Sequence, residues 1–320
     1  MDIAWNWVFS VAAAIMLFLH GLAAFSDEVT QLGGERMKAL LRRVTRSDWL
    51  GATLGALATT LVQSSSAVTS MAVGLADKRT LSPRGATAVM IGANVGTTLT
   101  AWLVAFKVAG LGPICLTVGG LWSLIGPRPW RSWGKPLFYF GLIFLALDLI
   151  SQALGPLASH PSLPHWQANL SEPALALLLG ALLTAVVQSS SVVSGLAVIS
   201  VGQGLLPIEM ALWMLVGSNV GTTSTALLAS TALGSLARKL AWLNTAFKVL
   251  GVLLFATVLQ PLISLILAST LTASHQVALV HTVFNVAAAV VALLIMPRAW
   301  SRLEPWLHAP EPLDPTGPRP

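Results

Sequence analysis

Cysteine and charge are both scarce in this chain. Its 320 residues include one cysteine, Cys115, and only 9% of the residues are charged. One cysteine excludes an internal disulfide and a cluster of cysteine ligands around a metal. Soluble domains carry about 25% charged residues, so the low charge and the 55% apolar content exclude an ordinary soluble protein. The composition predicts an all-α integral membrane protein that has membrane lipid as its solvent.

Basic residues outnumber acidic ones, but they do not indicate a nucleic-acid partner. The formal net charge is +6, yet the lysines and arginines lie in short loops between apolar segments, where membrane topology accounts for them. Residues 34–47 interleave Arg36, Lys38 and Arg42 with apolar side chains at helical spacing. This pattern predicts an amphipathic helix on the anionic cytoplasmic surface of the membrane.

The apolar segments define the expected spans. Residues 5–25 lack the basic leader and cleavage site of a secretory signal, so a retained span is expected there. The other apolar stretches cover residues 49–76, 85–111, 113–125, 137–157, 173–201, 208–233, 240–259 and 276–296. Residues 298–320 contain several prolines and are expected to form a disordered cytoplasmic tail.

The sequence repeats itself at a distance of 125 residues. The motif Gln-Ser-Ser-Ser at 63–66 recurs at 188–191, and Gly-Ala-Asn-Val-Gly-Thr-Thr at 92–98 recurs at 217–223 with serine in place of alanine. Aligned without a gap, residues 54–105 and 179–230 agree at 24 of 52 positions. Polar motifs that stand in both copies of an apolar sequence predict a site at the junction of two repeats.

The distribution of arginine and lysine predicts how the two Gln-Ser-Ser-Ser segments enter the membrane. If both segments cross, sixteen basic residues divide six against ten between the two sides. If both enter and return as re-entrant hairpins, all sixteen lie on one side, as the positive-inside rule requires. Three crossings separate the hairpins, so the hairpins open to opposite sides and the repeats are inverted. In a plasma (inner) membrane, the N-terminus is then outside and the C-terminus cytoplasmic.

The predicted fold therefore has two inverted-topology repeats, each with a re-entrant helical hairpin and a broken transmembrane helix. The first repeat covers 1–126, with its hairpin at 49–76 and its broken helix at 84–111. The second covers 136–260, with its hairpin at 173–201 and its broken helix at 208–233. A final transmembrane helix is predicted at 275–297.

The repeated motifs suit a small anion and a hard cation. Each serine cluster is expected to end one half-helix and to cap the next, with Thr97 or Thr98 capping the restart of the broken helix. Half-helix N-termini offer free N–H groups and partial positive charge, which favours a compact oxyanion. Oxygens of the glutamines and asparagines in these motifs suit sodium. No lysine or arginine lies in the motifs, so a bound cation is expected to balance the anion.

Together with His-Thr-Val-Phe-Asn at 281–285, these motifs resemble the sodium/phosphate cotransporter family, over about residues 10–297. This family includes type II carriers, and the chain is similar to a bacterial branch of the family that lacks the C-terminal regulatory domain. This similarity implies a secondary transporter, not an enzyme, in which sodium symport moves inorganic phosphate by alternating access. Na⁺ is then the coupling ion, and no organic cofactor is implied.

The resemblance also implies two overlapping sets of site residues. The phosphate set is Gln63, Ser64, Ser65, Ser66, Gln188, Ser189, Ser190, Ser191, Thr97, Thr98, Thr222 and Thr223. The sodium set is Gln63, Ser64, Asn94, Gln188, Ser189 and Asn219. Where relatives often place His-x-x-x-Asn, this chain has Asn244 and Lys248. A lysine there can replace a bound cation, which leaves the sodium stoichiometry open.

Four polar residues are accessory candidates: Asp148, Lys248, His281 and Asn285. Asp148 lies within an apolar span, where a bare carboxylate is costly. It either contributes to a cation path or pairs with a backbone donor or with Lys248. His281 and Asn285 lie four residues apart on one helix face, and they form either part of the site or an interhelical hydrogen-bonded pair.

The sequence is compatible with other functions to different degrees. An intramembrane hydrolase would use a serine with His281 as base, but Gly-x-Ser-x-Gly is absent and hydrolysis does not require paired serine clusters. A phosphate exporter would share the fold, since the motifs do not encode direction. A phosphate sensor or channel would keep the binding fold without coupled transport. A homodimer is compatible with each of these functions.

Overall fold

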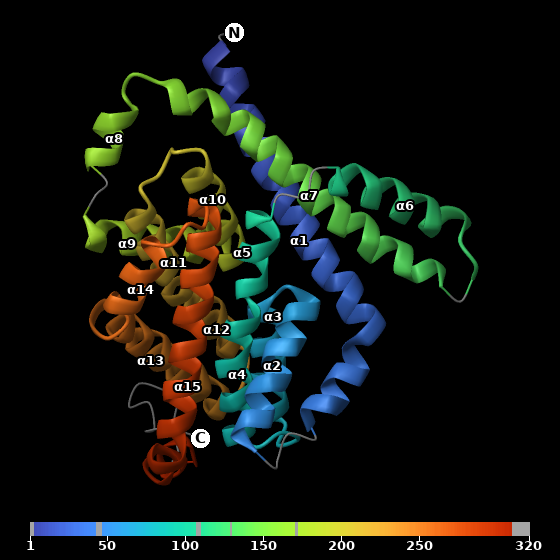
Figure 1. Cartoon of the computed structure of the whole chain (residues 1–320). Coiled ribbons are helices and arrows are strands. Elements are labelled where there is room, and N and C mark those ends of the chain that lie inside the picture. Colours follow the sequence, from blue (N-terminus) through green and yellow to red (C-terminus); the bar gives the residue numbers. More distant parts are fainter. Residues whose placement is uncertain (1–2, 43–46, 107–109, 129, 170–171, 309–320) are drawn as a thin grey trace, which may run out of the picture.

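The computed structural model describes residues 3–42, 47–106, 110–128, 130–169 and 172–308, and every regular element within these ranges is a helix (Figure 1). The first half contains α1 (Ile3–Arg42), α2 (Asp48–Val62), α3 (Ser65–Asp77), α4 (Pro83–Gly96), α5 (Thr98–Ala105), α6 (Leu111–Ile125) and η2 (Arg131–Trp133). The second contains α7 (Gly134–Leu154), η3 (Gly155–Ser159), α8 (Leu163–Asn169), α9 (Pro173–Val187), α10 (Ser190–Gly202), α11 (Ile208–Gly221), α12 (Thr223–Thr231), α13 (Ser235–Thr257), α14 (Gln260–Leu267) and α15 (Ala273–His308).

Five helical stretches are long and apolar enough to cross a membrane. They are Asn6–Leu41, Pro83–Ala105, Arg131–Ser159, Ser235–Thr257 and Ala273–Leu307. Many of their large apolar side chains are exposed, as expected where lipid is the solvent. The chain is a multi-pass, all-helical membrane protein, as its composition predicts.

Two helix pairs pack in the same way, one in each copy of the duplicated sequence. α2 packs along α4, and α9 packs along α11. A Cβ added at Gly92 would lie 1.8 Å from the carbonyl oxygen of Ala52, and one at Gly217 would lie 1.9 Å from that of Leu177. Because a Cβ fits at neither position, glycine allows the two backbones of each pair to touch. These rigid pairs position the motifs that follow α2 and α9.

α1 and α7 form a separate layer beside the bundle. Figure 1 shows these two long helices side by side, with α6 lying along α7 on the flank of the molecule. The bundle itself is built from α2–α5 and α9–α15. Phe18 of α1 is fully buried and joins the largest apolar cluster, together with Phe255 and Phe284. This cluster ties the long helices to the second half of the chain.

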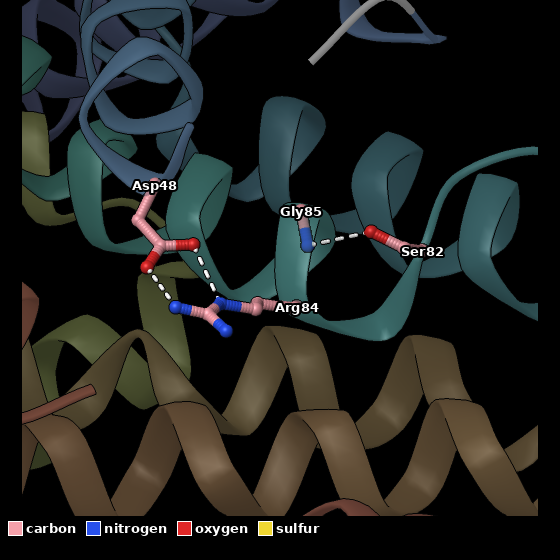
Figure 2. A network of polar contacts seen from close by, with 4 residues as sticks. All are labelled: Asp48, Ser82, Arg84 and Gly85. Atoms are coloured by element: carbon pink, nitrogen blue, oxygen red, sulfur yellow. Dashed lines mark hydrogen bonds and ion pairs between the residues drawn. The ribbon is translucent and has the colours of Figure 1, made fainter. Parts of the chain in front are cut away.

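An ion pair fixes the starts of α2 and α4. Figure 2 shows Arg84 facing Asp48, with Nε 2.8 Å from Oδ1 and Nη2 2.7 Å from Oδ2. Ser82 caps α4 by accepting a hydrogen bond of 3.0 Å from the N–H of Gly85. The Arg84 guanidinium also lies over the ring of Trp300, 5.9 Å from its centroid. One arginine therefore joins α2, α4 and α15, and its bidentate geometry favours a fixed arrangement.

The predicted tail begins later than the sequence suggested. Residues 298–308 belong to α15, which continues through Pro297 and Pro305. Trp300 and Leu307 are buried against the apolar cluster that contains Leu41 and Leu240. Packing of this amphipathic end offsets the hydrogen bonds that the prolines remove. Residues 309–320 of the predicted tail lie outside the described residues.

The predicted surface helix at 34–47 is not a separate element as far as it is described. α1 runs without interruption from Ile3 to Arg42, through Gly33 and Gly34. Leu41 is fully buried, so this end of α1 packs on protein through that side chain. Residues 43–46 of the prediction lie outside the described residues, as do residues 107–109 of the predicted broken helix.

Candidate functional site

Each Gln-Ser-Ser-Ser motif breaks the chain between two short helices. Gln63 ends α2 with φ 56° and ψ 24°, and Gln188 ends α9 with φ 60° and ψ 22°. Both conformations are left-handed, which costs a non-glycine residue roughly 1–2 kcal/mol. Their N–H groups bond to the carbonyls of Thr59 and Thr184, each at 2.7 Å. The same strained turn recurs 125 residues later, and such outliers gather at functional sites.

The capping predictions for the serines are only half right. Ser64 caps α3, because its Oγ accepts a hydrogen bond of 3.2 Å from the N–H of Ala67. Ser189 precedes α10 in the same extended conformation but makes no side-chain cap. The N-terminus of α10 therefore keeps N–H groups free of side-chain capping, and these can serve a ligand.

The broken helices are interrupted more mildly than predicted. Thr97 separates α4 from α5 and Thr222 separates α11 from α12, yet both residues keep right-handed helical dihedrals. Neither residue caps the following helix with its side chain. Instead, Thr97 Oγ1 donates to the carbonyl of Ala93 at 3.1 Å and Thr98 Oγ1 donates to that of Val95 at 2.8 Å. The hydroxyls bond back to the preceding turn, so the prediction that they cap the restart is wrong.

Reciprocal hydrogen bonds join the two copies of the repeat. Thr100 Oγ1 of α5 lies 3.3 Å from Ser191 Oγ of α10. Thr225 Oγ1 of α12 lies 3.1 Å from Ser66 Oγ of α3. Thr225 stands 125 residues after Thr100, and Ser191 stands 125 residues after Ser66. Each copy therefore gives its threonine to the serine motif of the other, which is the contact pattern of a two-fold related interface.

Several of the expected phosphate residues are buried near these contacts, whereas Gln188 is exposed. Thr100 Oγ1 is also 2.9 Å from Gln63 Oε1, and Gln188 Nε2 is 3.4 Å from Ser224 Oγ. A small polar pocket is lined by Ser65, Ser66, Thr69, Thr222, Thr225, Asn244 and Lys248. Residues with buried side chains are Ser65, Ser190, Ser191, Thr97, Thr98, Thr222 and Thr223.

The asparagines of the two repeats meet at a second small pocket next to the first. Asn94 and Asn219 line it together with Lys248 and Asn285. Asn219 Nδ2 donates to Asn285 Oδ1 at 3.0 Å, and Asn285 Nδ2 donates to the carbonyl of His281 at 2.9 Å. Asn285 therefore links α15 to α11. Side-chain amide oxygens suit a hard cation such as sodium.

Lys248 lies between the two pockets. It is 6% exposed in the middle of α13, and its Nζ donates to Thr222 Oγ1. Among the described residues the ion pairs are Lys38–Glu35, Arg84–Asp48 and Lys135–Glu28, so Lys248 is not paired with a carboxylate there. The alternative in which Asp148 pairs with Lys248, which the sequence left open, is therefore wrong. Asp148 is exposed on α7, because α7 packs on α1 and α6 through its other faces.

The arrangement does not support nucleophilic catalysis by a serine. His281 is 3% exposed, and its Nδ1 has no hydrogen-bond partner among the described residues. The serine hydroxyls of the motifs bond to threonines and backbone, not to this imidazole, in the described part of the chain. A hydrolase needs its nucleophile and base within hydrogen-bond reach.

Thr100 and Thr225 are residues of the candidate site that the motif analysis missed. Both lie two residues beyond the second motif, and they agree in the alignment of the two copies. Thr69 also lines the serine pocket, and its counterpart Ser194 is fully buried with an Oγ that has no hydrogen-bond partner among the described residues. The signal for Thr100 and Thr225 was their identity at the repeat distance, which extends past the recognisable motifs.

The site is rich in hydroxyls and amides, and it contains one cation and no carboxylate among the residues that line the two pockets. Buried, uncharged donors at helix N-termini suit an anion that must be bound and then released. A multi-pass membrane protein with such a site at the junction of two sequence copies has the architecture of a secondary transporter.

Comparison with known proteins agrees with that class. The Na+/Pi-cotransporter family model matches residues 17–152 and 158–296. The chain belongs to the Na+/Pi-cotransporter family. This is a family of membrane transporters and not of enzymes, as the sequence predicts. No solved structure matches the chain.

Individual relatives cover different shares of the chain. YqeW of Bacillus subtilis, an uncharacterized protein, is 28% identical over 297 residues, which is 90% of this chain and 93% of YqeW. The "Putative inorganic phosphate export protein YjbB" of Salmonella typhimurium is 28% identical over 276 residues, and this match spans about half (51%) of that protein's length. "Sodium-dependent phosphate transport protein 2C" of Mus musculus is 41% identical over 85 residues, 25% of this chain and 14% of that protein.

Proposed function

We propose that this protein is a sodium-coupled carrier of inorganic phosphate that works by alternating access. Family membership and the names of two relatives, a sodium-dependent phosphate transport protein and a putative phosphate export protein, support this substrate. The single observation that carries the proposal is the reciprocal pair of contacts, Thr100 with Ser191 and Thr225 with Ser66. These contacts support a shared site at the junction of the two sequence copies.

The proposed topology is that of inverted repeats with re-entrant hairpins. α2 has 15 residues and α9 has 15 residues, and at 1.5 Å per residue each reaches about 22 Å. The hydrocarbon core is about 30 Å thick, so each helix is too short to cross and suits a hairpin that turns near the midplane. The α2–α3 hairpin then opens to the cytoplasm and the α9–α10 hairpin to the outside, with the N-terminus outside.

In this proposal phosphate binds where the two serine motifs meet. Ser65, Ser66, Ser190 and Ser191 supply hydroxyls, and the N-termini of α3 and α10 supply N–H groups. Sodium binds next to the phosphate through side-chain oxygens of Gln63, Gln188, Asn94 and Asn219. The coupling is electrostatic, because a cation bound beside the anion lowers the cost of burying either charge.

The experiment is counterflow of labelled phosphate in proteoliposomes that contain the purified protein. A coupled carrier accumulates labelled phosphate transiently when unlabelled phosphate is inside, and sodium accelerates the exchange. Binding without flux would mean a sensor, and flux without acceleration by internal phosphate would mean a channel. Either result contradicts the proposal.

Net export is the second candidate function, favoured by the YjbB relatives that are named as export proteins. The site is the same, and the direction depends on the ion and phosphate gradients. Net flux measured under sodium gradients of either sign distinguishes the two: uptake driven by inward sodium supports symport, and outward movement of phosphate against inward sodium supports export by another coupling.

A further inference from the structure

Lys248 carries a positive charge into the centre of the described bundle. It belongs to a helix long and apolar enough to span a membrane, and its side chain is buried. A buried ammonium without a counter-charge is costly, and charged residues inside a membrane protein are therefore paired or functional. No carboxylate pairs with Lys248 among the described residues. An anionic ligand would supply the negative charge that is missing beside Lys248.

The surroundings of Lys248 are polar and come from both copies of the repeat. On one side stand hydroxyls of Ser65 and Ser66 from α3 and of Thr225 from α12. On the other side stand the amides of Asn94 and Asn219. One of the three ammonium hydrogens goes to Thr222 Oγ1, so two remain for another acceptor.

A second buried side chain on the same helix has an oxygen without a hydrogen-bond partner among the described residues. Asn244 lies one turn before Lys248, is 4% exposed, and its Oδ1 has no hydrogen-bond partner within the described part of the chain. Asn244 and Lys248 line the same pocket. Together they offer two N–H donors and one oxygen acceptor, which suits a phosphate oxygen beside a protonated phosphate oxygen.

The lysine breaks the symmetry of the site. Its counterpart 125 residues earlier is Ser123, whose Oγ donates to the carbonyl of Gly120 within α6. α6 packs on α7 at the flank of the molecule (Figure 1), whereas α13 packs on α3, α4 and α12. Only one copy thus brings a cation into the shared site.

We propose that Lys248 is a fixed cation of the substrate site: its ammonium binds the transported phosphate and takes the place of one bound sodium ion. This inference rests on the proposed function, because it assumes that phosphate binds at the serine pocket. It predicts that the protein needs one sodium ion fewer for each phosphate than the same site with an uncharged residue at position 248.

The test is equilibrium binding of labelled inorganic phosphate to the purified full-length protein at a series of sodium concentrations. Lys248→Gln and Lys248→Met are expected to weaken phosphate binding by about ten- to a hundredfold at low sodium, as for loss of a hydrogen bond to a charged group. High sodium is expected to restore part of the lost phosphate affinity, so that binding depends more steeply on sodium than in the wild type. Lys248→Arg is expected to keep the shallow sodium dependence.

Two controls make the outcome decisive. Lys239→Gln removes a lysine at the start of the same helix, where Nζ bonds to the carbonyl of Trp306, and phosphate binding is expected to stay unchanged. Methionine fills a similar volume without charge, and replacing a buried charge by an apolar residue often keeps or raises stability, so Lys248→Met is expected to fold. If a folded Lys248→Met variant binds phosphate with wild-type affinity and sodium dependence, the proposed role of Lys248 is overturned, and the proposed function is not. A wild type that binds no phosphate would overturn the proposed function as well.

Discussion

At the scale of single residues, the proposed site depends on hydroxyl groups that carry no charge. Serine and threonine can donate to an anion and accept near a cation, and their hydrogens rotate to suit either ligand. The motif residues Ser65, Ser190 and Ser191 are buried at the starts of α3 and α10. A site of this kind binds an oxyanion without trapping it, which a carrier requires for release.

Replacing Ser65 or Ser190 with alanine is expected to weaken phosphate and sodium binding together. A lost hydrogen bond to a charged ligand costs about 1.5–3 kcal/mol, which is about ten- to a hundredfold in affinity. Labelled phosphate binding at fixed sodium, and its sodium dependence, measure both effects. Ser70→Ala on the same helix α3 is the matched control. Unchanged phosphate and sodium affinity in both variants would remove these serines from the site.

The residues of the site were partly predictable from the sequence. The serine motifs, Asn94 and Asn219 were found because they recur at one distance. Thr100 and Thr225 lie outside any motif; their identity at the repeat distance was a weak signal, and the crossed contacts with Ser191 and Ser66 give them a place in the candidate site. The Asp148–Lys248 pair was an open alternative because a sequence does not tell which face of a helix packs on its neighbours.

At the scale of helices, the breaks and the close packing act together. Gln63 and Gln188 hold strained left-handed conformations that end α2 and α9. This strain is sustained because each preceding helix is fixed along its partner, α2 on α4 and α9 on α11. Glycines at the crossing points allow backbone contact, so the position of each serine motif follows from the packing of the helix before it.

Gly92→Ala and Gly217→Ala are expected to destabilise the protein. The added Cβ would lie within 2 Å of a backbone carbonyl oxygen in each case, and a backbone cannot move aside as a flexible side chain can. Overpacking costs about 1–3 kcal/mol, more than the roughly 1 kcal/mol that alanine gains over glycine in a helix. A lower melting temperature in detergent is the expected result. Gly74→Ala is the control, since no atom lies within 4 Å of its added Cβ, and an equal melting temperature for all three variants would contradict the packing argument.

The helix boundaries show where local sequence rules succeed and fail. The ends of α2 and α9 coincide with the motifs, because serines compete for backbone hydrogen bonds and favour caps over helix interiors. The prolines at 297 and 305 suggested a tail, but α15 continues because Trp300 and Leu307 pack on the bundle. A separate surface helix was expected at 34–47, but α1 runs without a break from Ile3 to Arg42. In both cases tertiary packing outweighs a local preference.

At the scale of the whole molecule, the duplication is only partly symmetric. The helix pairs, the strained glutamines and the crossed hydrogen bonds recur in both copies. The helices that follow the two broken helices differ. In the second copy α13 packs within the bundle, whereas in the first copy α6 packs on α7 at the flank. The ion pair of Asp48 with Arg84 likewise has no counterpart, because Pro173 and Glu209 stand at the equivalent positions. Sequence comparison showed the symmetry, but it could not show which parts depart from it.

Alternating access requires that the two sides of the site open in turn. Asp77 Oδ1, at the end of α3, accepts a hydrogen bond of 3.2 Å from the N–H of Gly234, just before α13. We expect a disulfide between Asp77→Cys and Gly234→Cys, in a Cys115→Ser background, to hold this side closed. Phosphate counterflow is expected to fall at least about tenfold after oxidation and to recover with a reductant, each compared with the single-cysteine variants. Full exchange in the oxidised protein would show that these segments need not separate.

The central claim is that the two copies of the repeat face opposite sides of one membrane. Lys78 ends α3, and Gln203 stands 125 residues later at the end of α10. In a Cys115→Ser background, a single cysteine at each position is labelled in intact cells with a membrane-impermeant thiol reagent. The account predicts that Gln203→Cys is labelled from outside, whereas Lys78→Cys is labelled only after the membrane is opened. Labelling of both cysteines from the same side would contradict inverted repeats and, with them, the shared site between the two serine motifs.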